Sequence, residues 1–418
     1  MPRDSVAEIE RRVRSLQAKF NRPEKRGGDA LPVLVDAADA PNVYFLRRPS
    51  GIIELDLHTG GGLPAGGLVY LSGPDGAGKT FLLHKYFAMH QRLYGPKSSI
   101  CYATSESPPD HMRMRATGVR VAVPDENLDD MDKSRKERGL PILTQAEREE
   151  LQTQTGRVMC LRHQTAEQVL QALLIAIESK AFDIVALDSV SALIPEAEAG
   201  KDLDEHAQQA AAASALTRFF QHYLPLTTGF RGANETTVVF VSQVRSNRKK
   251  SEAASHFAKY MKDWAPQGAW AAKHGKLIDV CVWGSSPERE TQRTDVAGIG
   301  GTTHQEMKVA VRKTMHWQIL KGKVGTHDGI TGEVEYNFAP PFTDDGRDLI
   351  LTAISKGVVV EKKGELTFFA GPRKEPDKRF TSIANIDEGA ALLKNDFELE
   401  LAIRREVLAT AGIQCLYR

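Results

Sequence analysis

The sequence has few cysteines and no long apolar run. Its four cysteines, Cys101, Cys160, Cys281 and Cys415, are scattered along 418 residues and never form a C-x-x-C pair, so neither a zinc knuckle nor a disulfide framework is indicated. No segment approaches the roughly 18 consecutive apolar residues of a membrane span, and the first residues lack an apolar secretory segment. We therefore expect a cytoplasmic protein without membrane partners.

An excess of charge of either sign is also absent. The 55 Lys and Arg residues almost balance the 54 Asp and Glu residues, which gives a net charge of +1. The field of the whole molecule therefore will not attract nucleic acid, and any polyanion site must be a local cluster of basic side chains. The length of 418 residues allows one large domain with smaller appendages.

The strongest positive signal is a glycine-rich loop between an apolar run and a segment with helical spacing. Residues 73–80 read GPDGAGKT, a complete G-x-x-x-x-G-K-[ST] pattern. In such a loop the backbone N–H groups surround a triphosphate, the Lys reaches its β and γ oxygens, and the Thr hydroxyl binds Mg²⁺. The predicted nucleotide site consists of Gly73, Pro74, Asp75, Gly76, Ala77, Gly78, Lys79, Thr80 and Phe81.

The region from about residue 50 to 340 alternates apolar strands with helical segments. This order predicts an α/β fold with a mostly parallel twisted sheet that is covered on both faces. A helix is expected over 166–179, where Thr165 and Gln168 form a capping-box pattern. The expected strands are 67–73, 98–106, 157–163, 182–190, 236–243 and 277–284.

Three further segments lie outside this alternation. Residues 5–20 have helical spacing and predict either a strut on the main domain or an arm on a neighbouring subunit. The charge-dense stretch 124–156 predicts a solvated insertion, a short helical hairpin, with partner docking as the alternative. After residue 342 we expect a small α+β domain with a helix at 345–356, a hairpin, and helices at 386–395 and 397–411.

Three polar residues stand at the ends of predicted strands, namely Glu106, Asp188 and Gln243. Open α/β sheets bind ligands at the carboxyl ends of their strands. We therefore expect Asp188 to hold the metal beside Thr80, Glu106 to polarise the attacking water, and Gln243 to contact the γ-phosphate. Each residue also has a purely structural alternative. Asp188 can be a helix cap, Glu106 a surface carboxylate in a turn, and Gln243 a polar strand end that contacts only solvent.

The segment that follows Gln243 mixes basic and aromatic side chains. This combination is typical of single-stranded nucleic-acid binding, because cations contact phosphates and rings stack on bases. The aromatic residues can alternatively be part of a core. The predicted DNA contacts here are Arg245, Arg248, Lys249, Lys250, Phe257, Lys259, Tyr260 and Lys262.

With these motifs in order, the chain resembles the RecA recombinase family, most closely over 55–80 and 166–198 and more loosely over 238–245. The resemblance implies a P-loop RecA-like ATPase core that binds ATP and Mg²⁺. It also implies a filament on single-stranded DNA that pairs with homologous double-stranded DNA, and ATP hydrolysis that depends on DNA. The implied domains are an N-terminal oligomerisation arm (1–47), the ATPase core (48–341) and the C-terminal α+β domain (342–418).

The resemblance also assigns roles that the residues alone do not. Lys321 and Lys323 would reach the γ-phosphate of the neighbouring subunit, whereas on sequence alone they are solvated charges of a hairpin. Asp110 and Phe338 fall where the family contacts adenine, and Gln243 would couple ATP to DNA.

Some features depart from the family pattern. The first DNA-facing loop, 195–205, is net acidic, and Lys201 is its only obvious cation. The insertion 124–156 and a lengthened segment 284–313 are also unusual, and this divergence favours a phage-encoded protein. Three alternatives stay open: a hexameric helicase, which would normally offer an arginine finger in place of the Lys321 and Lys323 pair, a non-catalytic recombination mediator, and a clock-type or signalling ATPase of the same fold, which would not require the basic and aromatic segment.

Overall fold

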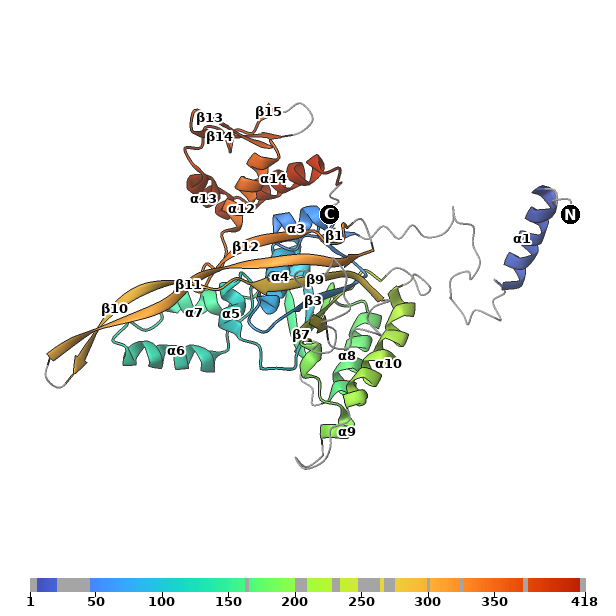
Figure 1. The fold of residues 1–418 in the computed structure, drawn as a ribbon, viewed down its shortest axis with the longest axis horizontal. Helices are drawn as coiled ribbons and strands as arrows, with labels where there is room; N and C mark the ends of the chain where they lie inside the picture. Colours follow the sequence, from blue (N-terminus) through green and yellow to red (C-terminus); the bar gives the residue numbers. More distant parts are fainter. Residues whose placement is uncertain are drawn as a thin grey trace.

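The computed structural model describes residues 6–20, 46–161, 165–199, 209–227, 234–246, 264–266, 275–298, 301–323, 326–370 and 375–413. Within these ranges the chain forms one large sheet with helices on both faces and a smaller α+β unit near the C-terminus (Figure 1). No helix in these ranges has the length and apolar character needed to cross a bilayer.

The central sheet has the strand order β10-β11-β9-β3-β7-β6-β4-β5, with β12 paired to β11 and β8 paired to β7. The strands from β9 to β5 in this order are parallel to one another, which confirms the predicted mostly parallel sheet. The central strands are β3 (Leu68–Gly73), β4 (Ser99–Thr104), β5 (Arg157–Leu161), β6 (Ile184–Asp188), β7 (Thr237–Ser246) and β9 (Lys276–Gly284).

An antiparallel extension follows β9. The strands β10 (Glu288–Gly298) and β11 (Gly301–Gly322) form a long hairpin, and β12 (Thr331–Asn337) pairs with the second half of β11. Figure 1 shows this hairpin extending away from the rest of the sheet. It accounts for the lengthened segment 284–313, for which the sequence predicted no strands. The remaining short strands are β1 (Arg47–Arg48), β2 (Leu63–Pro64) and β8 (Trp264–Pro266).

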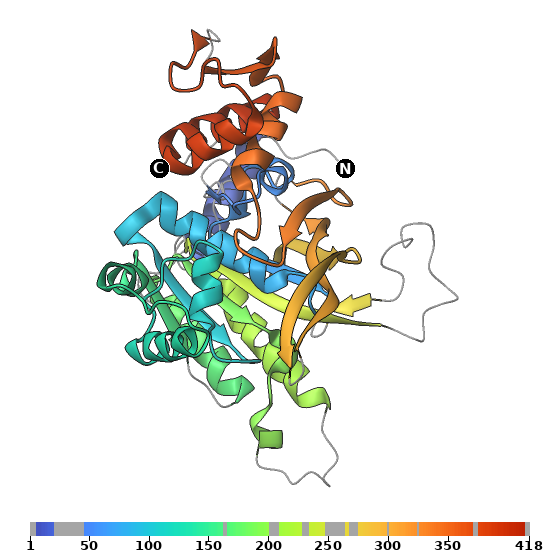
Figure 2. The same ribbon diagram turned by 90° about the vertical axis from the view of Figure 1, so that its left-hand side faces the viewer.

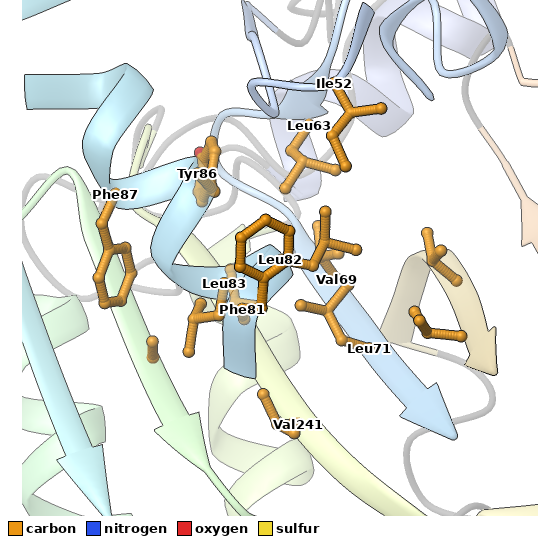
Figure 3. Close-up of a cluster of buried hydrophobic side chains, with 14 of the residues drawn as sticks. Ile52, Leu63, Val69, Leu71, Phe81, Leu82, Leu83, Tyr86, Phe87 and Val241 are labelled. Carbon is orange, nitrogen blue, oxygen red and sulfur yellow. The ribbon is translucent and has the colours of Figure 1, made fainter. Parts of the chain in front are cut away.

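Different helices cover the two faces of the sheet (Figure 2). On one face, α4 (Lys79–Tyr94) buries Phe81, Leu83 and Phe87 in a cluster that includes Val69 and Leu71 of β3 (Figure 3). On the other face, α8 (Ala166–Glu178) and α10 (Gln209–Thr227) pack against β3, β6 and β7. The Thr165 hydroxyl accepts a hydrogen bond from the backbone N–H of Gln168, so the predicted N-cap of α8 is present.

The insertion 124–156 forms the predicted helical hairpin, α6 (Asp125–Glu137) and α7 (Gln145–Gln152). Its small core contains Val123, Leu128 and Leu143. Arg148 ties the two helices together through hydrogen bonds to Asp132 and Asp129. Among the described residues before 340, the other α-helices are α1 (Val6–Phe20), α3 (Ile53–His58), α5 (His111–Ala116) and α9 (Glu196–Ala199).

The C-terminal elements match their predicted positions. They are α12 (Asp345–Ser355), β13 (Val359–Lys362), β14 (Glu365–Ala370), β15 (Glu375–Pro376), α13 (Ile386–Asn395) and α14 (Phe397–Thr410). The helices and the strands β13 and β14 share a core that also contains Ile53 of α3. Lys85 of α4 pairs with Asp345, and Arg92 of α4 pairs with Glu400 at 2.6 Å, so ion pairs join this unit to the sheet domain.

Candidate functional site

The glycine-rich loop lies between the end of β3 and the start of α4, as the sequence predicts. All three of its glycines have a positive φ, namely 157° at Gly73, 65° at Gly76 and 107° at Gly78. A Cβ atom on Gly73 would lie 2.1 Å from the Val282 carbonyl oxygen, and one on Gly78 would lie 2.6 Å from the Met315 sulfur. The loop can therefore pass beneath β9 and β11 only with glycine at these positions.

Lys79 begins α4 and is almost fully buried. Its ammonium donates a 2.7 Å hydrogen bond to the Pro74 carbonyl across the loop, and burial lowers its pKa. A buried cation with one neutral acceptor is available to an anionic ligand that enters the loop. This geometry fits the predicted contact between Lys79 and nucleotide phosphates.

Thr80 and Asp188 meet at the predicted metal position. The Thr80 hydroxyl donates a 2.6 Å hydrogen bond to the Asp188 carboxylate, which ends the fully buried strand β6. Burial raises the pKa of Asp188, whereas its hydrogen bonds from Thr80 and Tyr102 act in the opposite direction. A hydroxyl and a carboxylate at this separation supply the oxygen ligands that Mg²⁺ prefers, so the residues present fit this ion.

Glu106 and Gln243 lie together at the same sheet edge. The Glu106 carboxylate accepts hydrogen bonds from the Ser189 hydroxyl at 2.6 Å and from the Gln243 amide at 3.1 Å. The backbone N–H of Gln243 in turn donates to the Ser191 hydroxyl at 2.8 Å. The structure therefore brings together the three strand-end residues that were predicted from their positions.

Not every predicted nucleotide contact has its side chain at the loop. Phe81 is buried in the core, with its ring edge-to-face with Tyr336 at 5.0 Å, so only its backbone can face a phosphate. Asp110 is the N-cap of α5, where its carboxylate accepts a 2.9 Å hydrogen bond from the Arg113 amide. Phe338 follows β12 and is 44% exposed, so its ring is open to a stacking partner.

Lys321 and Lys323 lie far from the loop of their own subunit. In the pairing of β11 with β9, Lys321 is opposite Asp279 and Gly322 is opposite Ile278. Ile278 in turn pairs with Val69, near the start of β3. The glycine-rich loop leaves β3 four residues later, about 13 Å along the strand. Both lysines make interactions within the chain. The two lysines therefore lie beside the start of β3, whereas their own glycine-rich loop follows its end.

Most predicted DNA contacts lie outside the described residues. These are Lys201, Arg248, Lys249, Lys250, Phe257, Lys259, Tyr260 and Lys262. The backbone of Arg245 belongs to β7 and pairs with Ala265 of β8. Only one residue, Val244, therefore separates Gln243 from Arg245 in the strand.

Four residues of the site were not predicted from the sequence: Tyr102, Ser189, Ser191 and Lys313. The two serines follow Asp188 in the run DSVS, and hydroxyls directly after a strand-end carboxylate are a signal that could have identified them. Lys313 donates a 2.6 Å hydrogen bond to the Gly76 carbonyl. Nothing in its local sequence indicates this contact.

Comparison with known proteins places this site in a family. The model of the KaiC ATPase family matches residues 48–262, slightly more than half of the chain. Over 222 residues the chain is 27% identical to the RecA protein of Solidesulfovibrio magneticus, covering 53% of this chain and 50% of the relative. It is 28% identical over 242 residues to RecA of Arthrospira platensis, covering 58% and 54%.

A third relative, the protein RecA 2 of Myxococcus xanthus, is 29% identical over 199 residues, which cover 47% of this chain and 44% of the relative. The chain thus spans about half the length of the curated relatives that it matches.

Proposed function

The chain belongs to the KaiC family of ATPases, and from this membership together with its similarity to RecA proteins we propose that it is a RecA-type recombinase. In this proposal it polymerises on single-stranded DNA, hydrolyses ATP in a DNA-dependent reaction, and pairs the bound strand with homologous double-stranded DNA. The observation that carries the proposal is the hydrogen bond between Gln243 and Glu106. It links a carboxylate suited to water activation with the strand that leads into the basic and aromatic segment.

The nucleotide would bind in the glycine-rich loop, with Lys79 on the β and γ phosphates and Thr80 and Asp188 holding Mg²⁺. The bound ion would neutralise negative charge that develops on the phosphates. Glu106 would orient the attacking water and accept its proton. Its two hydrogen-bond donors, Ser189 and Gln243, fix the carboxylate at the edge where the water must lie.

Gln243 would act as the sensor that joins the two sites. When a γ-phosphate is present, the amide can donate to it in place of Glu106, and β7 would shift with it. Because β7 continues into the segment with the predicted DNA contacts, nucleotide occupancy would change DNA affinity. We extend this DNA role to Lys201, Arg245, Arg248, Lys249, Lys250, Phe257, Lys259, Tyr260 and Lys262.

Lys321 and Lys323 would complete the site from a neighbouring subunit. They lie at the end of β11, opposite the first residues of β9 and away from their own loop, and this location supports a role between subunits. In a homo-oligomeric filament each interface would then contain one glycine-rich loop and one lysine pair. The helix α1 would serve as the subunit arm, which is consistent with its exposed Val13 and Leu16.

The direct test measures ATP turnover with and without single-stranded DNA at low and high salt. We expect stimulation by DNA that weakens as salt rises, because phosphate contacts release counterions. No stimulation at low salt would contradict the DNA role. Electron microscopy with single-stranded DNA and a non-hydrolysable ATP analogue should show helical filaments, whereas closed rings would indicate a hexameric helicase.

The shared site has its own test. A Lys79→Ala variant and a Lys321→Ala/Lys323→Ala variant should each be inactive. In an equimolar mixture, about a quarter of the interfaces would combine an intact loop with an intact lysine pair, because neighbours assemble head to tail. Recovery of DNA-dependent ATP turnover in the mixture supports a site between subunits, and no recovery contradicts it.

A further inference from the structure

Lys313 joins the long hairpin to the glycine-rich loop. It lies in β11 opposite Tyr336 of β12, and its ammonium donates a 2.6 Å hydrogen bond to the carbonyl of Gly76. The same ammonium is 5.5 Å from the ring centroid of Tyr336 and 5.7 Å from that of Phe338. Lys313 therefore lies between the loop expected to hold phosphates and the exposed ring expected to contact the base.

The charge of Lys313 is not balanced by a carboxylate of the described residues. Its polar contact is a neutral carbonyl, and its remaining contacts are to ring faces. Partial burial lowers the pKa of Lys313, and the positive charge of Arg113 on α5 lowers it further. A half-buried ammonium with a second cation nearby is unfavourable by itself and becomes favourable when an anion binds beside it.

We propose that Lys313 is a further nucleotide-contacting residue, whose ammonium binds the phosphate chain of a nucleotide held in the glycine-rich loop. This proposal rests on the proposed function, because it takes the loop to be the ATP site. The ammonium already lies against the loop backbone at Gly76, so a small rotation of its flexible side chain would exchange the carbonyl for a phosphate oxygen. An ionised acceptor makes the stronger hydrogen bond of the two.

The contact also has a structural consequence. Lys313 belongs to the strand that forms the extended hairpin with β10. A phosphate that draws the Lys313 ammonium from the Gly76 carbonyl would therefore act on the base of this hairpin. Nucleotide binding would therefore change the position of two strands of the sheet, β7 through Gln243 and β11 through Lys313.

The test is equilibrium titration of the full-length protein with AMP-PNP and Mg²⁺, using Lys313→Met, Lys313→Gln and Lys313→Arg. Glutamine can still donate a hydrogen bond to the Gly76 carbonyl but carries no charge, whereas arginine keeps the charge. The matched control is Lys308→Met, which removes one positive charge from an exposed position of the same strand. Circular dichroism of each variant verifies that it is folded.

We expect Lys313→Met and Lys313→Gln to bind AMP-PNP about tenfold more weakly, as expected for loss of one charged hydrogen bond. Lys313→Arg should recover most of the affinity, Lys308→Met should match the wild type, and the deficit should shrink at high salt. Normal affinity of Lys313→Met, or full recovery by Lys313→Gln, would overturn the proposal. Failure of the wild type to bind AMP-PNP would instead contradict the proposed function itself.

Discussion

The amide of Gln243 donates a 3.1 Å hydrogen bond to the carboxylate of Glu106, although 137 residues separate the two along the chain. They meet because β4 and β7 are parallel strands of one sheet, and their carboxyl ends reach the same edge. Each residue has a second anchor, the Ser189 hydroxyl for Glu106 and the Ser191 hydroxyl for the backbone of Gln243. The residue proposed to activate water and the strand that leads into the segment of proposed DNA contacts are therefore in direct contact.

This contact predicts that Gln243→Ala separates nucleotide binding from DNA binding. The variant should still bind AMP-PNP, because Lys79 and Thr80 are unchanged and the lost hydrogen bond to the γ-phosphate only replaces the one that Gln243 makes to Glu106. The increase in affinity for single-stranded DNA that AMP-PNP produces, about 5- to 150-fold for typical coupled sites, should fall below about twofold. Fluorescence anisotropy with labelled single-stranded DNA measures the affinity in the presence and in the absence of AMP-PNP. Gln221→Ala, at an exposed position of α10, is the control that should retain the coupling.

Thr80→Val should abolish the Mg²⁺-dependent part of ATP binding. Valine keeps the shape of threonine but removes the hydroxyl that bonds Asp188, so the ion loses one of its oxygen ligands. We expect AMP-PNP affinity to fall at least about tenfold in Mg²⁺ and to match the wild type in EDTA. Thr80→Ser, which keeps the hydroxyl, should bind normally. An equal loss with and without Mg²⁺ would show that the threonine does not act through the metal.

Much of the site could be predicted because it depends on chain-local patterns and one rule of topology. The glycine-rich loop is contiguous in sequence, and Asp188 ends a fully apolar run. The rule that parallel strands end at one edge then brings Glu106, Asp188 and Gln243 together without any knowledge of their contacts. The C-terminal helices and hairpin were likewise predicted from their periodicity.

Other parts could not be predicted because they depend on pairing between distant strands. The contact of Lys313 with Gly76 exists only because β11 pairs with β9 and β12 in one register. A shift by one residue would turn the lysine to the other face. Phe81 is a prediction that failed for its side chain. Its position next to the loop suggested a ligand contact, but the ring points from α4 into the core.

Lys85→Met should destabilise the attachment of the C-terminal unit. Lys85 is buried on α4 and forms an ion pair with Asp345 at the start of α12. Its removal leaves the carboxylate with Thr343 as its hydrogen-bond donor. Because Asp345 is partly solvated, we expect a loss of about 2 kcal/mol, below the range for a fully buried pair.

Urea denaturation measures this loss, and a second substitution, Asp345→Asn in the Lys85→Met background, should recover part of it. The matched control is Arg347→Met, which removes the cation of the exposed ion pair between Arg347 of α12 and Asp387 of α13. It should cost less than about 1 kcal/mol. Equal losses in Lys85→Met and Arg347→Met would show that the buried pair does not join the two parts.

Asp348→Asn should stabilise the protein, and the stabilisation should grow as pH rises from about 4 to about 7. Burial raises the pKa of Asp348 to about 7, and the negative charges of Asp345, Asp344 and Glu54 add to this effect, whereas Lys85 opposes it. A carboxyl whose pKa is higher in the folded state than in the unfolded state destabilises the fold progressively as pH rises from its unfolded pKa, about 4, to its folded pKa, and no further above it. We expect Asp348→Asn to exceed the wild type by about 1–2 kcal/mol at pH 8, with the difference decreasing below the folded pKa and vanishing only near pH 4, the approximate pKa of an unfolded aspartate. Urea denaturation across this range measures the difference, and Asp348→Glu, which keeps an ionisable group, should retain the pH dependence. A difference between Asp348→Asn and wild type that stays constant from pH 5 to pH 8 would mean that ionisation of Asp348 is not its cause.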